Sequence, residues 1–210
     1  MQFNLDDLAA IDCYELLLGT VVPRPIGIVT TLSEGSALNA APYSLFNIVS
    51  HDPPVLVFSV LPHPEGRFKD TAVNILATRE FTLSLVSEAL AEAMNITCID
   101  APPGISELDL AGLTTEPSAN ISPPRIANSP VVFECRFLTS LSFAANQATI
   151  FGRIVTAHVA DRFVLDAGRA VVDTPALKLI GGMHAARWYA RLSDRFEMER
   201  PSWSERSNST

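Results

Sequence analysis

The chain has 210 residues, of which 48% are hydrophobic and 18% charged, and its formal net charge is −8. This length and composition are typical of one globular domain with a large buried core. The acidic balance argues against nucleic acid as a partner, because phosphate contacts need clustered Lys and Arg side chains. No apolar run approaches the ~20 residues of a membrane-spanning helix, and the N-terminus lacks the pattern of a signal peptide.

The cysteines indicate a reducing compartment. Cys13, Cys98 and Cys135 are odd in number and widely spaced. They fit neither a disulfide framework nor a zinc site, so a cytoplasmic location is expected.

The first part of the chain predicts one short helix and several strands. Residues 12–17 form the helix, which Gly19 should end. Pro23 and Pro25 place the start of the next strand at a sheet edge or bulge, because each proline removes a backbone donor. The first predicted strand covers 21–32, and residues 38–41 begin the strand that returns beside it in a hairpin. Residues 46–49 are expected to continue this second strand, and the apolar run 55–60 is a further strand.

The second part continues with two helices and more strands. Asp70 is the expected cap of a helix over 71–78, and Ser87 that of a helix over 87–94. Six prolines in 100–130 indicate a long functional or mobile excursion, such as a lid or dimer arm, with one helical turn near 106–111. The later strands are 81–86, 131–140 and 148–161, with a bulge at Gly152, and the fold ends over 173–191.

These elements predict a mainly β fold. Six or seven strands, few helices and no βαβ alternation favour an antiparallel β-barrel with Greek-key connections and peripheral helices. Residues 1–196 are expected to form a single domain, and the polar segment 197–210 a frayed C-terminal tail.

A phosphate site is predicted where the helix over 71–78 begins. Its first turn offers free backbone N–H groups and a positive dipole end, Lys69 adds a charge, and Thr71 adds a hydroxyl donor. The plain alternative is an ordinary helix start with a solvated lysine.

Two further segments have both a functional and a structural interpretation. Arg24, held between two prolines, either serves a ligand or pairs with a carboxylate at a sheet edge. Residues 39–47 are small where a flat ring could approach the backbone, and Ser44 and Asn47 offer hydrogen bonds. A tight connection between strands explains the same residues.

The remaining polar residues do not form a catalytic pair. The histidines at 51, 63, 158 and 184 lack metal-ligand spacing. His158 is interpreted as a hydrogen-bonded strand residue, whereas His184, near Trp188 and Tyr189, could lie over a ligand. Glu107 and Asp109 are expected to be solvated, so any redox chemistry would belong to a cofactor.

In order and spacing, the segments resemble the flavin reductase-like, FMN-binding split-barrel family, and within it the branch with a Pro-Arg-Pro-Ile strand. The resemblance covers roughly residues 14 to 190. The matching stretches are 23–31, 39–46, 52–54, 69–75 with 80–81, 106–107 with 111–113, and the strand around 134–135. The match over 183–189 is looser.

The resemblance implies a six-stranded antiparallel split β-barrel that forms a homodimer, with FMN in a groove at the interface. Residues 39–47 would hold the ring and ribityl chain, Ser59 would lie near the flavin, and 69–71 would take the phosphate. The implied cofactor-binding residues are Arg24, Thr31, Asn39, Ala41, Ser44, Phe46, Asn47, Ser59, Lys69, Asp70 and Thr71. His184 is the one side chain with an open catalytic role.

The expected function is that of an FMN oxidoreductase, which passes a hydride from NADH or NADPH to flavin and on to an acceptor. A partner oxygenase is one such acceptor. The alternatives are an FMN carrier or electron-transfer protein without nicotinamide turnover, and a barrel that has lost its flavin. The preferred nicotinamide, the final acceptor and whether flavin stays bound are left open by the sequence.

Overall fold

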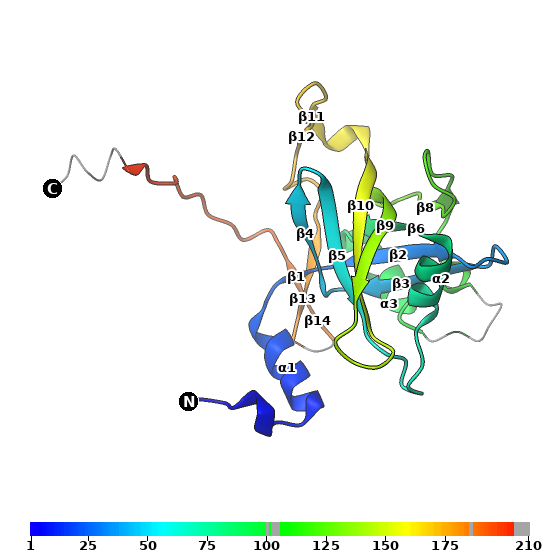
Figure 1. The fold of residues 1–210 in the computed structure, drawn as a ribbon. Helices are drawn as coiled ribbons and strands as arrows, with labels where there is room; N and C mark the ends of the chain where they lie inside the picture. Colours follow the sequence, from blue (N-terminus) through cyan, green and yellow to red (C-terminus); the bar gives the residue numbers. More distant parts are fainter. Residues whose placement is uncertain (100, 102–105, 185–186, 204–210) are drawn as a thin grey trace.

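One antiparallel sheet dominates the computed structural model, which describes residues 1–99, 101, 106–184 and 187–203 (Figure 1). The mainly β, antiparallel class is therefore confirmed. The seven strands lie in the order β3 (Leu38–Tyr43), β2 (Gly27–Leu32), β6 (Glu80–Leu85), β9 (Val131–Leu141), β10 (Ala148–Val159), β5 (Pro54–Val60) and β4 (Phe46–His51).

The main sheet has seven strands rather than six, because the segment after Tyr43 does not continue β3. It forms β4, which pairs with β5 at the opposite edge of the sheet. In Figure 1, β2 and β3 run across the view while β5, β9 and β10 run up it, so the sheet is strongly bent. Within the described residues, no pairing joins the edge strands β3 and β4.

Short elements surround the main sheet. A second sheet contains β1 (Arg24–Pro25), β13 (Ile180–Met183) and β14 (Trp188–Arg191). The helices are α1 (Ala10–Thr20), α2 (Asp70–Thr78), α3 (Ala91–Ile96) and α4 (Glu107–Leu110), and 3-10 turns cover Leu5–Asp7, Glu88–Leu90 and Asp161–Phe163. Two hairpins pair β7 (Thr115–Glu116) with β8 (Arg125–Ile126) and β11 (Val164–Asp166) with β12 (Val171–Val172).

Several element boundaries differ from expectation. The first helix continues through Gly19 to Thr20, so this glycine does not end it. The helix expected over 87–94 divides into a 3-10 turn and α3. Residues 106–130 of the proline-rich segment contain α4 and the β7–β8 hairpin, and the remaining expectations for 100–105 fall largely outside the described residues.

Aromatic packing inside the bent sheet explains the glycine at position 152 of β10. The Phe58 and Phe81 rings meet edge to face with centroids 5.3 Å apart. The register of β9 and β10 shifts between Phe151 and Gly152, but the extra residue is Leu138 of β9, so the bulge expected at Gly152 lies in the strand opposite it. A Cβ atom at Gly152 would lie 2.4 Å from the Phe81 ring, so the close approach requires glycine here.

A buried carboxylate anchors the proline-rich segment to the sheet. Glu134 of β9 is fully buried, and its oxygens accept hydrogen bonds from the backbone N–H groups of Ala119 (2.6 Å) and Asn120 (2.8 Å). His158 Nε2 of β10 lies 2.6 Å from the same carboxylate, which confirms His158 as a hydrogen-bonded strand residue. This arrangement holds the segment across one face of β9.

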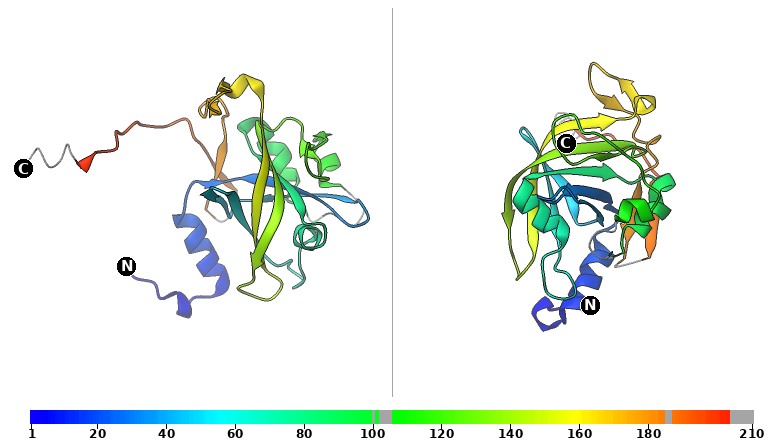
Figure 2. Two further views of the ribbon diagram at one scale, coloured as in Figure 1. Left: turned by 45° about the horizontal axis from the view of Figure 1, so that its top comes forward. Right: turned by 90° about the vertical axis from the view of Figure 1, so that its right-hand side faces the viewer.

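The two chain ends lie away from the sheet. In Figures 1 and 2, α1 stands outside it, and the chain from Leu192 to Trp203 extends away from the other elements. Among the described residues, no helix has the length and apolar character needed to cross a membrane.

Candidate functional site

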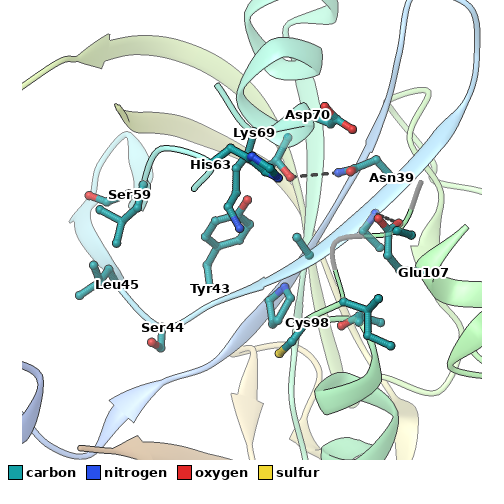
Figure 3. A pocket seen from close by; sticks show the side chains of 18 of the residues that line it. Asn39, Tyr43, Ser44, Leu45, Ser59, His63, Lys69, Asp70, Cys98 and Glu107 are labelled. Atoms are coloured by element: carbon teal, nitrogen blue, oxygen red, sulfur yellow. Dashed lines mark hydrogen bonds between the residues drawn. The ribbon is translucent and has the colours of Figure 1, made fainter. Parts of the chain in front are cut away.

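A cavity of about 310 Å³ lies where β3 meets the beginning of α2 (Figure 3). Its volume falls in the range of small-molecule sites, roughly 300–1,000 Å³. The walls come from α1, β3 with the turn after it, the end of β5 with the following loop, the start of α2, the chain after α3, and α4. The cavity is therefore assembled from segments far apart in the sequence.

The beginning of α2 gives the cavity a site for an anion. Lys69 is the residue before the first helical turn, and the Ala72 N–H donates to its carbonyl oxygen at 2.9 Å. The N–H groups of Asp70 and Thr71 precede this bond and have no acceptor inside the helix. Together with the dipole of α2 and the charge of Lys69, they favour a negative group.

Asp70 does not cap α2, contrary to expectation. It is the first helical residue, and no side-chain cap bond forms at this helix start. Its carboxylate instead lies 3.3 Å from Nη1 of Arg67. The N–H groups of the first turn are consequently not occupied by the Asp70 side chain.

A buried polar network ties β3 to α2. Asn39 Nδ2 donates to the Thr71 hydroxyl at 3.0 Å and lies 3.2 Å from the Thr31 hydroxyl, to which Asn74 also donates at 3.0 Å. Because the Thr71 oxygen accepts from Asn39, its own proton remains available to donate. The network thus orients the hydroxyl at the helix start.

Small residues of β3 form another wall. Ala40, Ala41 and Pro42 line the cavity with little side-chain bulk, so a flat ring can approach the backbone there. The Ala40 N–H donates to the Glu107 carboxylate at 3.3 Å. Glu107 is half-buried and lines the cavity, so the expectation of a merely solvated acid was wrong for this residue, whereas Asp109 is exposed.

A second, smaller cavity of about 130 Å³ adjoins the first. The two share Pro42, Tyr43, Ser44 and Cys98. Burial raises the pKa of the Cys98 thiol, and nearby Lys69 only partly offsets this. Burial likewise raises the pKa of Tyr189, with Cys98 contributing, so both groups stay protonated at neutral pH.

Seven of the sequence-predicted residues are brought together around the larger cavity. They are Asn39, Ala41, Ser44, Ser59, Lys69, Asp70 and Thr71. Ser59 also bonds through its hydroxyl to that of Thr149, at 3.0 Å. Their roles toward a ligand stay predictions.

The other predicted residues lie elsewhere. Thr31 is fully buried behind Asn39, Phe46 packs in the core, and the Asn47 side chain accepts from the Ile48 N–H. Arg24 and His184 line the smaller cavity. Arg24 has no carboxylate partner among the described residues, because its guanidinium donates to the carbonyl oxygens of Leu18, Val21 and His184.

Several lining residues carry no local signal in the sequence. Tyr14 comes from α1, His63 and Arg67 come from the loop before α2, and Thr97 follows α3. Only the tertiary fold brings these residues to one place. No group of three or more His, Cys, Asp or Glu side chains suited to a metal occurs in the described part of the chain.

The chain is similar to known proteins in sequence and fold. Residues 18–174 match the family model described as flavin reductase like domain. The uncharacterized protein YwrF of Bacillus subtilis is 42% identical over 205 residues, which are 95% of this chain and 98% of that protein.

Two solved structures are similar over nearly their whole length. The 2-nitrobenzoate 2-nitroreductase NbaA of Pseudomonas fluorescens has a TM-score of 0.87 at 31% identity, covering 97% of this chain and 98% of that one. Component B of nitrilotriacetate monooxygenase from Bacillus cereus has a TM-score of 0.87 at 32% identity, covering 94% and 98%. The chain therefore belongs to the flavin reductase-like family.

Proposed function

We propose that the chain is an FMN-dependent oxidoreductase that takes electrons from NADH or NADPH. The observation that carries this proposal is the larger cavity, in which an anion site at the start of α2 adjoins a wall of small residues on β3. A flavin mononucleotide has a phosphate for the first and a flat ring for the second. Bound FMN would supply the redox chemistry by accepting a hydride.

The residues present fit this cofactor. Lys69, the Thr71 hydroxyl and the free N–H groups of α2 would hold the phosphate, while Asn39 keeps Thr71 in position. Ser44 and Ser59 offer hydrogen bonds along the cavity, and the backbone of Ala40–Pro42 would face the ring. No nucleophile-and-base pair is needed from the chain, because its task is to bind and orient.

Steady-state oxidation of NADH and NADPH tests this proposal. We expect the rate to rise with added FMN and to saturate as the site fills. Saturable FMN binding without nicotinamide oxidation would replace the proposal with the carrier or electron-transfer function. If the protein does not bind FMN, both the oxidoreductase function and the carrier or electron-transfer function are refuted.

The acceptor and the assembly are also proposals. We propose that electrons pass to an oxygenase or another acceptor, which the monooxygenase component and the nitroreductase among the similar structures support by analogy. A homodimer is supported by exposed apolar residues on the edge strand β4 (Ile48 and Val49) and on α1 (Ile11 and Leu17). The molecular mass in solution tests the dimer.

The finer architecture is a further proposal. We propose that the seven-stranded sheet forms a split β-barrel with Greek-key connections over residues 1–196, with 197–210 as a tail. The strong bend of the sheet and the family membership support it. A crystal structure showing an open sheet without a barrel would contradict it.

A further inference from the structure

The smaller cavity contains a buried positive charge without a counter-ion. Arg24 is 6% exposed and lines this cavity, and no carboxylate of the described chain lies within ion-pair distance of it. Its three acceptors are the carbonyl oxygens of Leu18, Val21 and His184, and its Nε atom has no hydrogen-bond partner. A buried charge is costly unless it is paired, so the cavity is electrostatically prepared for an anion.

A second cation lies at the same cavity. Arg187 is exposed, and its backbone has a φ of +76°, a left-handed conformation that is uncommon for a residue other than glycine. His184, which accepts from Arg24 through its carbonyl oxygen, has a φ of +54°. Such backbone conformations cost free energy and concentrate at ligand sites.

The remaining walls are aromatic and apolar. Trp188 is 68% exposed and Tyr189 43% exposed, and both line the cavity together with Met94 and Met183. The rings of Trp188 and His184 meet edge to face with centroids 6.4 Å apart. Exposed aromatic side chains around a hollow are suited to a flat ring.

Size limits the ligand. The cavity volume of about 130 Å³ is well below that of a typical drug-sized site, roughly 300–1,000 Å³. It suits a molecule with a single ring and is too small for a dinucleotide. Since it shares Pro42, Tyr43, Ser44 and Cys98 with the larger cavity, a ligand here would lie against the occupant of that cavity.

We propose that the smaller cavity binds a small aromatic carboxylate. Arg24 supplies the buried charge, Arg187 contacts the carboxylate from the rim, and Trp188 and Tyr189 pack against the ring. That this molecule is the second substrate rests on the proposed function, whereas its binding does not.

Benzoate titration tests the binding without flavin. The chain has two tryptophans, so Trp203→Phe in the tail leaves Trp188 as the only tryptophan, whose emission can be excited selectively over that of tyrosine. We expect benzoate to change the Trp188 fluorescence saturably and benzamide, its neutral analogue, to bind about tenfold more weakly or worse. Arg187→Gln should reduce this preference, because Arg24 alone then faces the carboxylate, while leaving benzamide affinity unchanged.

The control is Arg191→Gln, because Arg191 lies on the same strand as Trp188 but pairs with Glu88 at 2.6 Å and does not line the cavity. It should bind benzoate as the parent does. Equal affinity for benzoate and benzamide, no fluorescence change, or an unaltered preference in Arg187→Gln would each overturn the proposal. The proposal would also be overturned if NADPH displaced benzoate and this displacement were weakened by Arg187→Gln in the same way as benzoate binding. A separate FMN titration shows whether the proposed function fails independently.

Discussion

Lys69→Ala is expected to weaken FMN binding by ~1.5–3 kcal/mol, the range of a charge-assisted hydrogen bond. Lys69 precedes the first turn of α2, where the N–H groups of Asp70 and Thr71 have no acceptor inside the helix, and all three residues line the larger cavity. Riboflavin lacks the phosphate, so its affinity should barely change. Titration of wild type and variant with both flavins, followed by flavin fluorescence, measures the difference.

Lys178→Ala is the matched control for this experiment. Lys178 is the only other lysine of the chain, it is exposed, and it lies outside both cavities. It should leave both affinities unchanged. Equal losses of FMN and riboflavin affinity in Lys69→Ala would refute the phosphate assignment.

Glu134→Ala is expected to lower the free energy of unfolding by ~1–3 kcal/mol, the cost of leaving hydrogen-bond donors without their acceptor. The substitution leaves the N–H groups of Ala119 and Asn120 without their acceptor and His158 without its carboxylate. The segment that they hold across β9 would lose its anchor. Urea unfolding at neutral pH measures the loss.

Glu116→Ala is the control, since Glu116 is a half-exposed carboxylate of the same segment that pairs with Arg125. Exposed pairs contribute up to about 1 kcal/mol, so this variant should be nearly as stable as the wild type. A Glu134→Ala loss no larger than that of Glu116→Ala would show that the buried carboxylate is not an anchor.

The same carboxylate should make stability depend on pH. Burial by itself would raise the pKa of Glu134, but the hydrogen bonds from Ala119, His158 and Asn120 outweigh it and lower the pKa. A carboxyl whose pKa is lowered by folding stabilises the protein above its ordinary pKa of about 4.3, and this contribution is lost as the pH falls through the lowered value. The stability difference between wild type and Glu134→Ala should therefore shrink on acidification below about pH 4.

Local patterns in the sequence predicted much of the fold. In the strand predicted over 131–140, alternate residues share a face, and Phe133, Cys135 and Phe137 all pack on the core. Gly152 indicated a close approach within its strand, and the register does shift beside it, although the extra residue belongs to β9. In each case the relevant signal lies within the strand itself.

Contacts between distant segments could not be predicted in this way. Glu134 lies on the same face of β9 as Val132. The Glu134 carboxylate is buried because residues 119–120 pack over this face and donate hydrogen bonds to it. Arg24 was expected either to serve a ligand or to pair with a carboxylate, yet one of its partners is the carbonyl oxygen of His184, 160 residues away.

The candidate site also combines features that local sequence predicts with contacts that depend on the whole fold. The helix start at Lys69–Thr71 and the small residues of β3 follow from local sequence, and both line the larger cavity. Its other walls, including Tyr14 and Glu107, come from segments whose approach depends on the whole fold. The smaller cavity likewise joins Arg24 to the β13–β14 region.

The most direct test of the proposed activity is an absorbance spectrum of the purified protein with FMN, recorded before and after addition of NADH or NADPH without oxygen. We expect the visible bands of oxidised flavin to remain with the protein after removal of free FMN and to bleach when nicotinamide is added. Bands that persist would contradict nicotinamide-dependent reduction and leave a flavin-binding protein. A colourless protein that does not retain FMN would contradict the site itself.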